Sequence, residues 1–183
     1  MNAIDLLLSR QSCPRLTLPA PSGQALDDIF QAAIRVPDHA ALTPWKFIAC
    51  EGEGLVKLGK LFEKTAIAEN FSENDIARAS KLPERAPMVI ICIMQHKEHQ
   101  KVPRIEQVAS TACAVQSMQM MALAHSFSGI WRTGSYAHSA YFKNLLGLNE
   151  QDEVVGFLYL GTPEVEPIHK PAKSAKDYFE IWC

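Results

Sequence analysis

The stretch Met88-Val89-Ile90-Ile91-Cys92-Ile93-Met94 decides the fold of this chain. These seven apolar residues follow Pro87 and precede a polar run that begins at Gln95. A continuous apolar run of this length predicts a strand that is buried on both of its faces. We therefore expect it to lie inside a sheet that helices flank.

Helical periodicity dominates the sequence around this strand. Between Ala112 and Ala124 ten of thirteen residues are apolar, and a helix that is apolar almost all round lies in the centre of a domain or along a dimer interface. Pro37 ends another amphipathic segment, because the residue before a proline disfavours the helical conformation. Helices are expected at residues 2–9, 23–36, 55–70, 72–81, 105–127 and 138–146, and strands at residues 45–50, 88–94 and 154–160.

The order of these elements indicates the fold class. Strands lie between helices along the chain, and helices outnumber them. This order predicts an α+β protein with α/β-like three layers, in which one mixed central sheet is flanked by helices. The chain has no internal repeat and no linker, so residues 1–183 are expected to form a single domain.

Composition and charge argue against several classes of protein. The 183 residues are 48% hydrophobic and 21% charged, with a formal net charge of -2. This near-neutral balance argues against a nucleic-acid binder that depends on a basic face. No apolar run reaches the ~18 residues of a membrane span, and the first residues lack the basic region of a signal peptide. We expect a cytoplasmic protein that binds neither nucleic acid nor membrane.

The cysteines are never spaced as C-x-x-C, and the histidines form only one metal-like spacing, His96 and His99. Cys50, Cys92 and Cys113 lie in apolar runs and are expected to be buried free thiols, which suits a reducing compartment. Cys13 lies in a polar stretch, where a catalytic thiol is the minor alternative. The two histidines of the polar run 95–104 have no further ligand at the spacing of a zinc site, so no metal site is expected.

Four polar or glycine-bearing segments interrupt the apolar pattern, and the first is Arg10-Gln11-Ser12. An arginine and a serine two residues apart on an extended segment point the same way and match the oxygens of a phosphate. An ordinary polar helix end is the alternative. The second segment contains Arg35 and His39 on either side of Pro37, where the alternative is an arginine that favours the helix dipole.

The other two segments contain glycine. In Gly129-Ile130-Trp131-Arg132-Thr133-Gly134 the glycines let backbone amides approach a planar ligand, and a turn with a packed tryptophan is the alternative. Gly156 lies inside the last expected strand and indicates that another backbone packs closely there. The sequence lacks the glycine patterns of Rossmann dinucleotide sites, P-loops and α/β-hydrolases.

In this order and spacing the segments resemble the nitroreductase family of flavin mononucleotide (FMN) enzymes, especially its short bacterial members. Gln11 stands where that family usually has the middle residue of Arg-Arg-Ser, the position least able to face a phosphate. The resemblance is carried by Ser9-Arg10-Gln11-Ser12, Arg35-x-Pro37-Asp38-His39 with Pro44-Trp45, Lys101-Val102-Pro103-Arg104, Gly129 to Gly134 and Gly156 to Pro163.

The resemblance implies a nitroreductase-like fold and an FMN-dependent oxidoreductase. NADH or NADPH would donate electrons in a ping-pong cycle to a small acceptor, nitroaromatic or quinone-like, at two flavin sites shared across a homodimer. The segment Arg10-Gln11-Ser12 would hold the phosphate and ribityl end of the flavin. Arg35 and His39 would reach the flavin across the dimer interface, and backbone groups of Trp131-Arg132-Thr133 would lie near its N5 and O4 atoms. No catalytic side chain is implied.

Two other classes of protein remain open on the sequence alone. One is a flavin-binding redox sensor or carrier without turnover of its own. The other is a dimeric scaffold that has lost flavin, to which the altered Gln11 would point. The family's fold also serves dehalogenases, flavin-fragmenting enzymes and oxidases, so the resemblance does not fix the reaction.

Overall fold

The computed structural model of the protein describes residues 2–165 and 174–183. Its strands are β1 (Leu16–Thr17), β2 (Trp45–Glu51), β3 (Met88–Met94), β4 (Ser128–Arg132) and β5 (Glu153–Pro163). Its helices are α1 (Ala3–Ser9), α2 (Gly23–Ala33), α3 (Glu53–Ala68), α4 (Glu73–Ala79), α5 (Arg104–Ala124), α6 (Ser135–His138) and α7 (Ala140–Leu145), with short 3-10 helices η1 (His39–Ala41), η2 (Pro83–Arg85) and η3 (Ala175–Asp177).

The predicted strand of residues 88–94 is β3, and all seven of its residues are buried. It lies inside the sheet, in the order β1-β5-β3-β2, and β4 also pairs with β5. A mixed sheet was expected, but every described pairing is antiparallel, so the sheet is antiparallel. Glu51 at the end of β2 pairs with Met88 at the start of β3, because α3 and α4 return the chain to the same end of the sheet.

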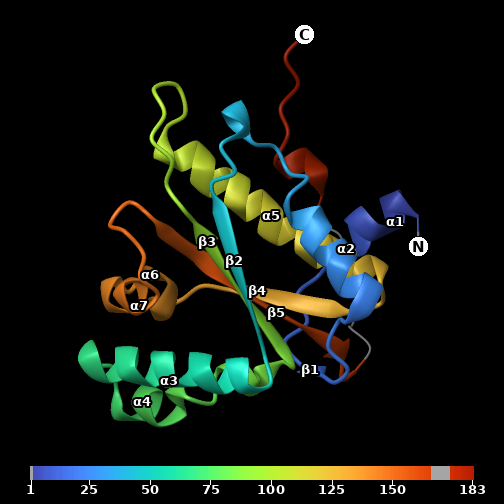
Figure 1. Cartoon of the computed structure of the whole chain (residues 1–183). Coiled ribbons are helices and arrows are strands. Elements are labelled where there is room, and N and C mark those ends of the chain that lie inside the picture. Colours follow the sequence, from blue (N-terminus) through green and yellow to red (C-terminus); the bar gives the residue numbers. More distant parts are fainter. Residues whose placement is uncertain (1, 166–173) are drawn as a thin grey trace.

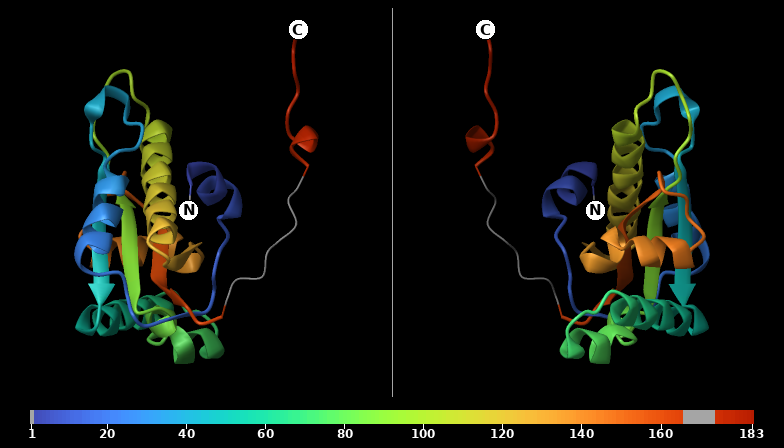
Figure 2. Two further views of the ribbon diagram at one scale, coloured as in Figure 1. Left: turned by 90° about the vertical axis from the view of Figure 1, so that its right-hand side faces the viewer. Right: turned by 90° about the vertical axis from the view of Figure 1, so that its left-hand side faces the viewer.

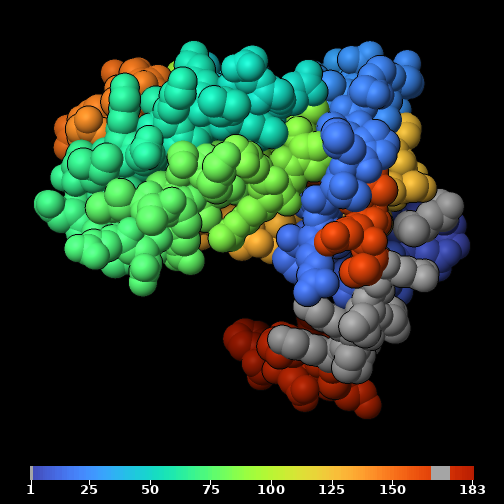
Figure 3. Space-filling model, turned by 90° about the horizontal axis from the view of Figure 1, so that it is seen from below, coloured from blue at the N-terminus to red at the C-terminus, as the bar shows by residue number. Residues whose placement is uncertain are grey.

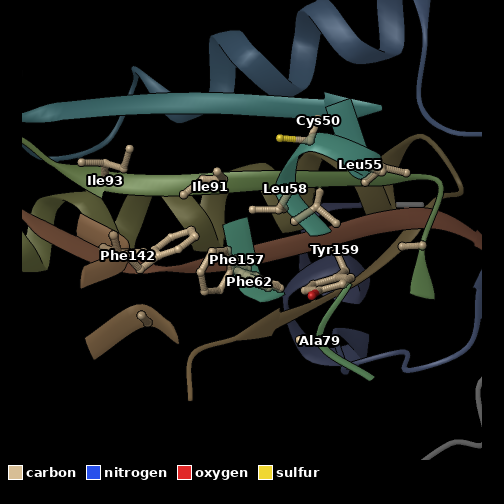
Figure 4. Packing of buried hydrophobic residues seen from close by; sticks show 14 of the residues in the cluster. Cys50, Leu55, Leu58, Phe62, Ala79, Ile91, Ile93, Phe142, Phe157 and Tyr159 are labelled. Atoms are coloured by element: carbon tan, nitrogen blue, oxygen red, sulfur yellow. The ribbon is translucent and has the colours of Figure 1, made fainter. Parts of the chain in front are cut away.

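Helices cover both faces of the sheet, which confirms the three expected layers. α3, α4, α6 and α7 pack on one face, and α2 and α5 pack on the other (Figure 1). On the first face Phe62 stacks on Tyr136 with ring centroids 4.2 Å apart and meets Phe157 edge-on at 5.1 Å. Figure 4 shows Phe62, Phe142 and Phe157 gathered between α3, α7 and β5. These rings fix the position of α6, which follows β4 in the chain.

Two regions differ from the sequence prediction for local reasons. The segment from Gly129 was expected as a glycine-flanked loop and not as a strand. Most of it forms β4, because glycine lets this strand lie close to β5: a Cβ at Gly129 would lie 2.7 Å from the Tyr159 carbonyl oxygen. The helix expected at residues 138–146 is the shorter α7 (Ala140–Leu145), and a further short helix, α6 (Ser135–His138), precedes it. Ser139 separates them, and its hydroxyl accepts a hydrogen bond from the Phe142 N–H at 2.9 Å, which caps α7.

The cysteines divide between the core and the surface. Cys50 and Cys92 are buried as predicted, and burial raises the pKa of both thiols, which keeps them protonated. Cys113 is exposed, which corrects the expectation, because it lies on the side of α5 that faces away from the sheet. Cys13 is buried, although its neighbours in the sequence are polar.

Large apolar side chains are exposed at both ends of the chain. On α1, Ile4, Leu7 and Leu8 are between 67% and 81% exposed. Residues 174–183 stand away from the body of the molecule (Figures 2 and 3), and Trp182 is 87% exposed. Exposed apolar surface of this kind is typical of regions that contact another molecule. In the described part of the chain no helix is long and apolar enough to cross a membrane.

Candidate functional site

The segment Arg10-Gln11-Ser12 lies beside the outer edge of β4. The Cys13 N–H donates a hydrogen bond to the Gly129 carbonyl oxygen at 3.0 Å. The same oxygen accepts a second hydrogen bond, at 2.9 Å, from the side-chain amide of Gln119, which is buried on α5. The structure thus brings the first and third predicted segments together. We call residues 10–13 and 129–132 the β4 corner.

The β4 corner presents backbone groups on its outer side. Successive residues of an antiparallel strand direct their N–H and C=O groups to alternate sides. Trp131 therefore directs its backbone groups to the same outer side as Gly129, whereas Arg132 directs its own toward β5, opposite Phe157. Thr133 follows the end of the strand and is exposed. Within β4, Trp131 is the predicted site residue whose backbone can meet a ligand.

Trp131 is held in place by a close approach between β4 and β5. Its indole N–H donates to the Val155 carbonyl oxygen at 3.2 Å. Gly156 makes this contact sterically accessible, because a Cβ there would lie 2.2 Å from the indole nitrogen, and its φ of +150° lies where other residues are strained. The close packing predicted from Gly156 is confirmed, and it fixes the geometry of the outer edge of β4.

The second predicted segment lies at the start of α5. The His39 Nδ1 atom lies 2.7 Å from a carboxylate oxygen of Glu106, and the Ser110 hydroxyl donates to the Pro37 carbonyl oxygen at 2.7 Å. Arg35 is exposed just beyond the end of α2. These contacts attach residues 35–44, which we call the α5 N-terminal loop, to the first two turns of the helix.

The β4 corner and the α5 N-terminal loop lie at different levels of α5. Glu106 contacts the loop and Gln119 contacts the corner. A separation of thirteen residues at 1.5 Å per residue places these contacts about 20 Å apart along the helix axis. The structure therefore does not bring Arg35 and His39 together with Arg10-Gln11-Ser12 through the contacts of this helix. One chain carries two separate parts of the predicted site.

Two residues of the site were absent from the sequence prediction. Gln119 had a visible signal, because a glutamine within an apolar helical run must find a hydrogen-bond partner when it is buried. Glu106 had no such signal, since an acidic residue in the first turn of a helix is ordinary. Its partner His39 lies 67 positions away in the sequence.

The two histidines of the polar run have near-neighbour side-chain contacts, and the His96 backbone N–H donates to the Asp152 carboxylate at 2.9 Å. His96 lies 3.5 Å from Glu98, and His99 accepts a hydrogen bond from the Lys101 N–H at 3.2 Å. Within residues 2–165 and 174–183, no three metal-ligating side chains come together as a site would require. Arginine, hydroxyl and backbone groups make up the candidate site.

The fold and the β4 corner together define an α+β protein of nitroreductase-like architecture. A crystal structure of a nitroreductase-like family protein from Bacillus cereus matches with a TM-score of 0.85 at 24% identity, over 100% of this chain and 96% of that chain. A structure from Desulfovibrio desulfuricans, described as a nitroreductase in complex with FMN, matches with a TM-score of 0.76 at 17% identity, over 100% of this chain and 99% of that chain. At these identities the likeness shows the fold.

The sequence comparisons establish the family. The model of the nitroreductase family matches residues 7–162. A protein of Escherichia coli (strain K12), named "Putative NAD(P)H nitroreductase YdjA", is 44% identical over 91% of each chain. A protein of Haemophilus influenzae, named "Putative NAD(P)H nitroreductase", is 37% identical over 88% of this chain and 89% of its own. The chain belongs to the nitroreductase family, as its motifs indicated.

Proposed function

We propose that the protein is an FMN-dependent oxidoreductase that takes electrons from NADH or NADPH and reduces a small nitroaromatic or quinone-like acceptor. The observation that carries this proposal is the β4 corner, where Arg10 and Ser12 lie beside a strand edge that presents the backbone of Trp131. Charged and backbone donors side by side suit a flavin, which has a phosphate at one end and a polar ring edge at the other. The names of the relatives support the same assignment.

The residues of the corner have separate tasks in this proposal. Arg10 and Ser12 hold the phosphate through charged hydrogen bonds, and Gln11 contributes its backbone. The outward backbone groups of Trp131, with Thr133 beyond the strand, orient the ring edge at N5 and O4. The bound flavin supplies the hydride acceptance and the electron transfer, so no side chain need act as a catalyst. The donor leaves before the acceptor enters the same pocket, which makes the cycle ping-pong.

The proposal includes a homodimer whose two flavin sites are each built from both chains. The axial separation of about 20 Å between the α5 N-terminal loop and the β4 corner supports this arrangement. A two-fold axis can bring the Arg35 and His39 of one chain to the corner of the other. The exposed apolar side chains of α1 and of residues 174–183 supply surface for the second chain to cover.

The cofactor is tested on the purified protein. We expect a yellow preparation whose colour NADH or NADPH bleaches and from which heat releases FMN. Recovery of FAD would contradict the phosphate site. A yellow protein that NAD(P)H does not reduce would instead be a carrier or sensor, and a colourless protein that takes up no FMN would be a scaffold. A screen of acceptors with the reduced protein then identifies the second substrate.

The shared site is tested by complementation between two variants. An Arg10→Ala chain is mixed with an Arg35→Ala chain, and the subunits are allowed to exchange. A site built across the interface leaves each heterodimer with one intact site and one doubly damaged site, so FMN binding should partly return. If all site residues come from one chain, every site keeps one lesion and mixing restores nothing. That outcome would end the shared-site proposal.

A further inference from the structure

A cleft whose lining residues are not among those assigned to the flavin lies on the face of the sheet that α3, α4 and α6 cover. Its volume is about 460 Å³. Gly134 and Ser135 line it, and in the chain they come two and three residues after the last residue of the β4 corner. Its lining also includes Phe71, Asp75, Arg78, Leu82, Arg85 and Tyr136.

Positive charge exceeds negative charge around this cleft. Arg78 forms an ion pair with Asp75. Arg85 has no carboxylate partner among the residues that the structure describes. A further guanidinium, that of Arg132, lies 5.7 Å from the centre of the Tyr159 ring, and its buried Nε has no hydrogen-bond partner in the described chain. Among the lining residues, the Arg85 guanidinium therefore remains without a balancing carboxylate, and Arg132 lies outside the lining.

Two tyrosines lie near charged side chains here: Tyr136 lies near Asp75 and Arg78, and Tyr159 lies near Arg132 and Arg85. Tyr136 is held by its stacking on Phe62, and its buried hydroxyl has no hydrogen-bond partner in the described part of the chain. Burial raises the pKa of Tyr159, while the charges of Arg132 and Arg85 oppose that rise, so both arginines act on one hydroxyl. A buried donor without an acceptor is costly. A ligand with a negatively charged oxygen would remove this cost and balance the charge.

We propose that this cleft binds the carboxylate of an aromatic acceptor, with Arg85 and Tyr136 as the groups that recognise it. A guanidinium and a phenol both donate to carboxylate oxygens. Phe71, Leu82 and the ring of Tyr136 supply apolar walls for the aromatic body. The reducible end of the acceptor then lies past Gly134, toward the β4 corner. This inference rests on the proposed function, because it names the acceptor class of the same redox site.

The experiment measures binding to the FMN-loaded protein by calorimetry with two matched ligands, 4-nitrobenzoate and uncharged 4-nitrobenzamide. The wild-type protein should bind the carboxylate about tenfold more tightly than the amide, the size expected of a charged hydrogen bond. Arg85→Gln should remove this preference, and Tyr136→Phe, which keeps the ring stacking, should reduce it. The control Lys81→Gln should keep it, because Lys81 pairs with Glu84 and does not line the cleft.

Phosphates of the nicotinamide donor share the anionic chemistry of a carboxylate and are tested in a separate arm. Adenosine 2′,5′-bisphosphate should bind the wild type and Arg85→Gln equally well. Weaker binding to the variant would overturn the proposal and assign the cleft to the donor. Equal binding of the two nitro ligands to the wild type, or an unchanged preference in Arg85→Gln, would overturn it as well. Flavin content is measured on each sample: absence of FMN contradicts the proposed function, whereas a flavin-loaded protein without the preference contradicts this inference alone.

Discussion

The two parts of the proposed site are held by contacts of different strength. The β4 corner is attached through the backbone hydrogen bond from Cys13 to Gly129 and through the buried amide of Gln119. The α5 N-terminal loop is attached through His39 and Glu106, whose side chains are 55% and 46% exposed, and through one hydrogen bond from the Ser110 hydroxyl to the Pro37 carbonyl oxygen. Buried hydrogen bonds resist distortion, whereas exposed ion pairs contribute little. The comparison indicates a rigid corner that selects the ligand and an adjustable loop that a second chain can position.

The largest effect is expected where the corner is packed most tightly. Gly156→Ala places a methyl group against the Trp131 indole at a strained backbone angle, and the free energy of unfolding should fall by about 3 kcal/mol. Urea denaturation measures this loss. The control Gly54→Ala adds a methyl at an ordinary contact distance of 3.5 Å within α3 and should not destabilise the protein. Equal stability of the two variants would show that the corner is not rigid.

The second prediction concerns the ligand side of the corner. Arg10→Ala should weaken FMN binding by roughly 2–4 kcal/mol, if this arginine makes desolvated charged hydrogen bonds to the phosphate. Fluorescence titration of the flavin measures the change. Lys60→Ala, on α3 at the opposite face of the sheet, should bind FMN like the wild type. An unchanged affinity in Arg10→Ala would leave Arg10 as a surface residue.

A smaller effect is expected at the buried amide that attaches the corner to α5. Gln119→Leu removes the donor to the Gly129 oxygen, which still accepts from Cys13, so the free energy of unfolding should fall by about 1 kcal/mol. Gln116→Leu, on the exposed side of the same helix, is the matched control. If both variants unfold at the same urea concentration, Gln119 does not hold the corner.

The smallest effect is expected for the pair of Asp28 on α2 and His125 at the end of α5. Hydrogen bonds from Gln24 and His125 lower the pKa of Asp28, so its carboxylate stabilises the folded state above the unfolded pKa of about 3.9. This contribution is lost as the pH falls through the lower pKa of the folded state. Asp28→Asn should therefore be less stable than the wild type at neutral pH, and the difference should shrink in strong acid. Asp27→Asn is the control, and a difference independent of pH would refute the role of Asp28.

Much of the fold could be predicted, because it depends on local pattern. The run from Met88 to Met94 is the fully buried strand, and the apolar segment from Ala112 to Ala124 belongs to the long helix that packs on it. Gly156 also marked a real close approach. The strand β4 was missed, because a short segment flanked by Gly129 and Gly134 reads as a loop until β5 is there to pair with it. Cys113 was misplaced, because an almost wholly apolar helix does not show which side meets the sheet.

The candidate site could likewise be predicted only in part. The residue types at Arg10-Gln11-Ser12, at Arg35 and His39, and at Trp131-Arg132-Thr133 were visible in the sequence, since charge, hydroxyl groups and glycine flanks are local properties. Their relative positions were not. The contact between Cys13 and Gly129 joins positions far apart in the chain. The backbone N–H and C=O groups of Trp131 point to the outer edge of β4, and those of Arg132 point toward β5. This alternation follows only from the register between β4 and β5.

The sequence by itself determined the layers of this protein, the family to which it belongs and the chemical types of its candidate site, because periodicity, burial and motif chemistry are properties of short segments. Only the tertiary structure decided that the sheet is antiparallel, that Gln119 and Gly156 hold the β4 corner, and that one chain carries the two parts of the site at different levels of α5. The physical reason is that these features depend on contacts between distant segments, which form only when the whole core packs. Such contacts set the strand register and the side of each helix that meets the sheet. They also bring Arg78, Arg85 and Tyr136 around one cleft.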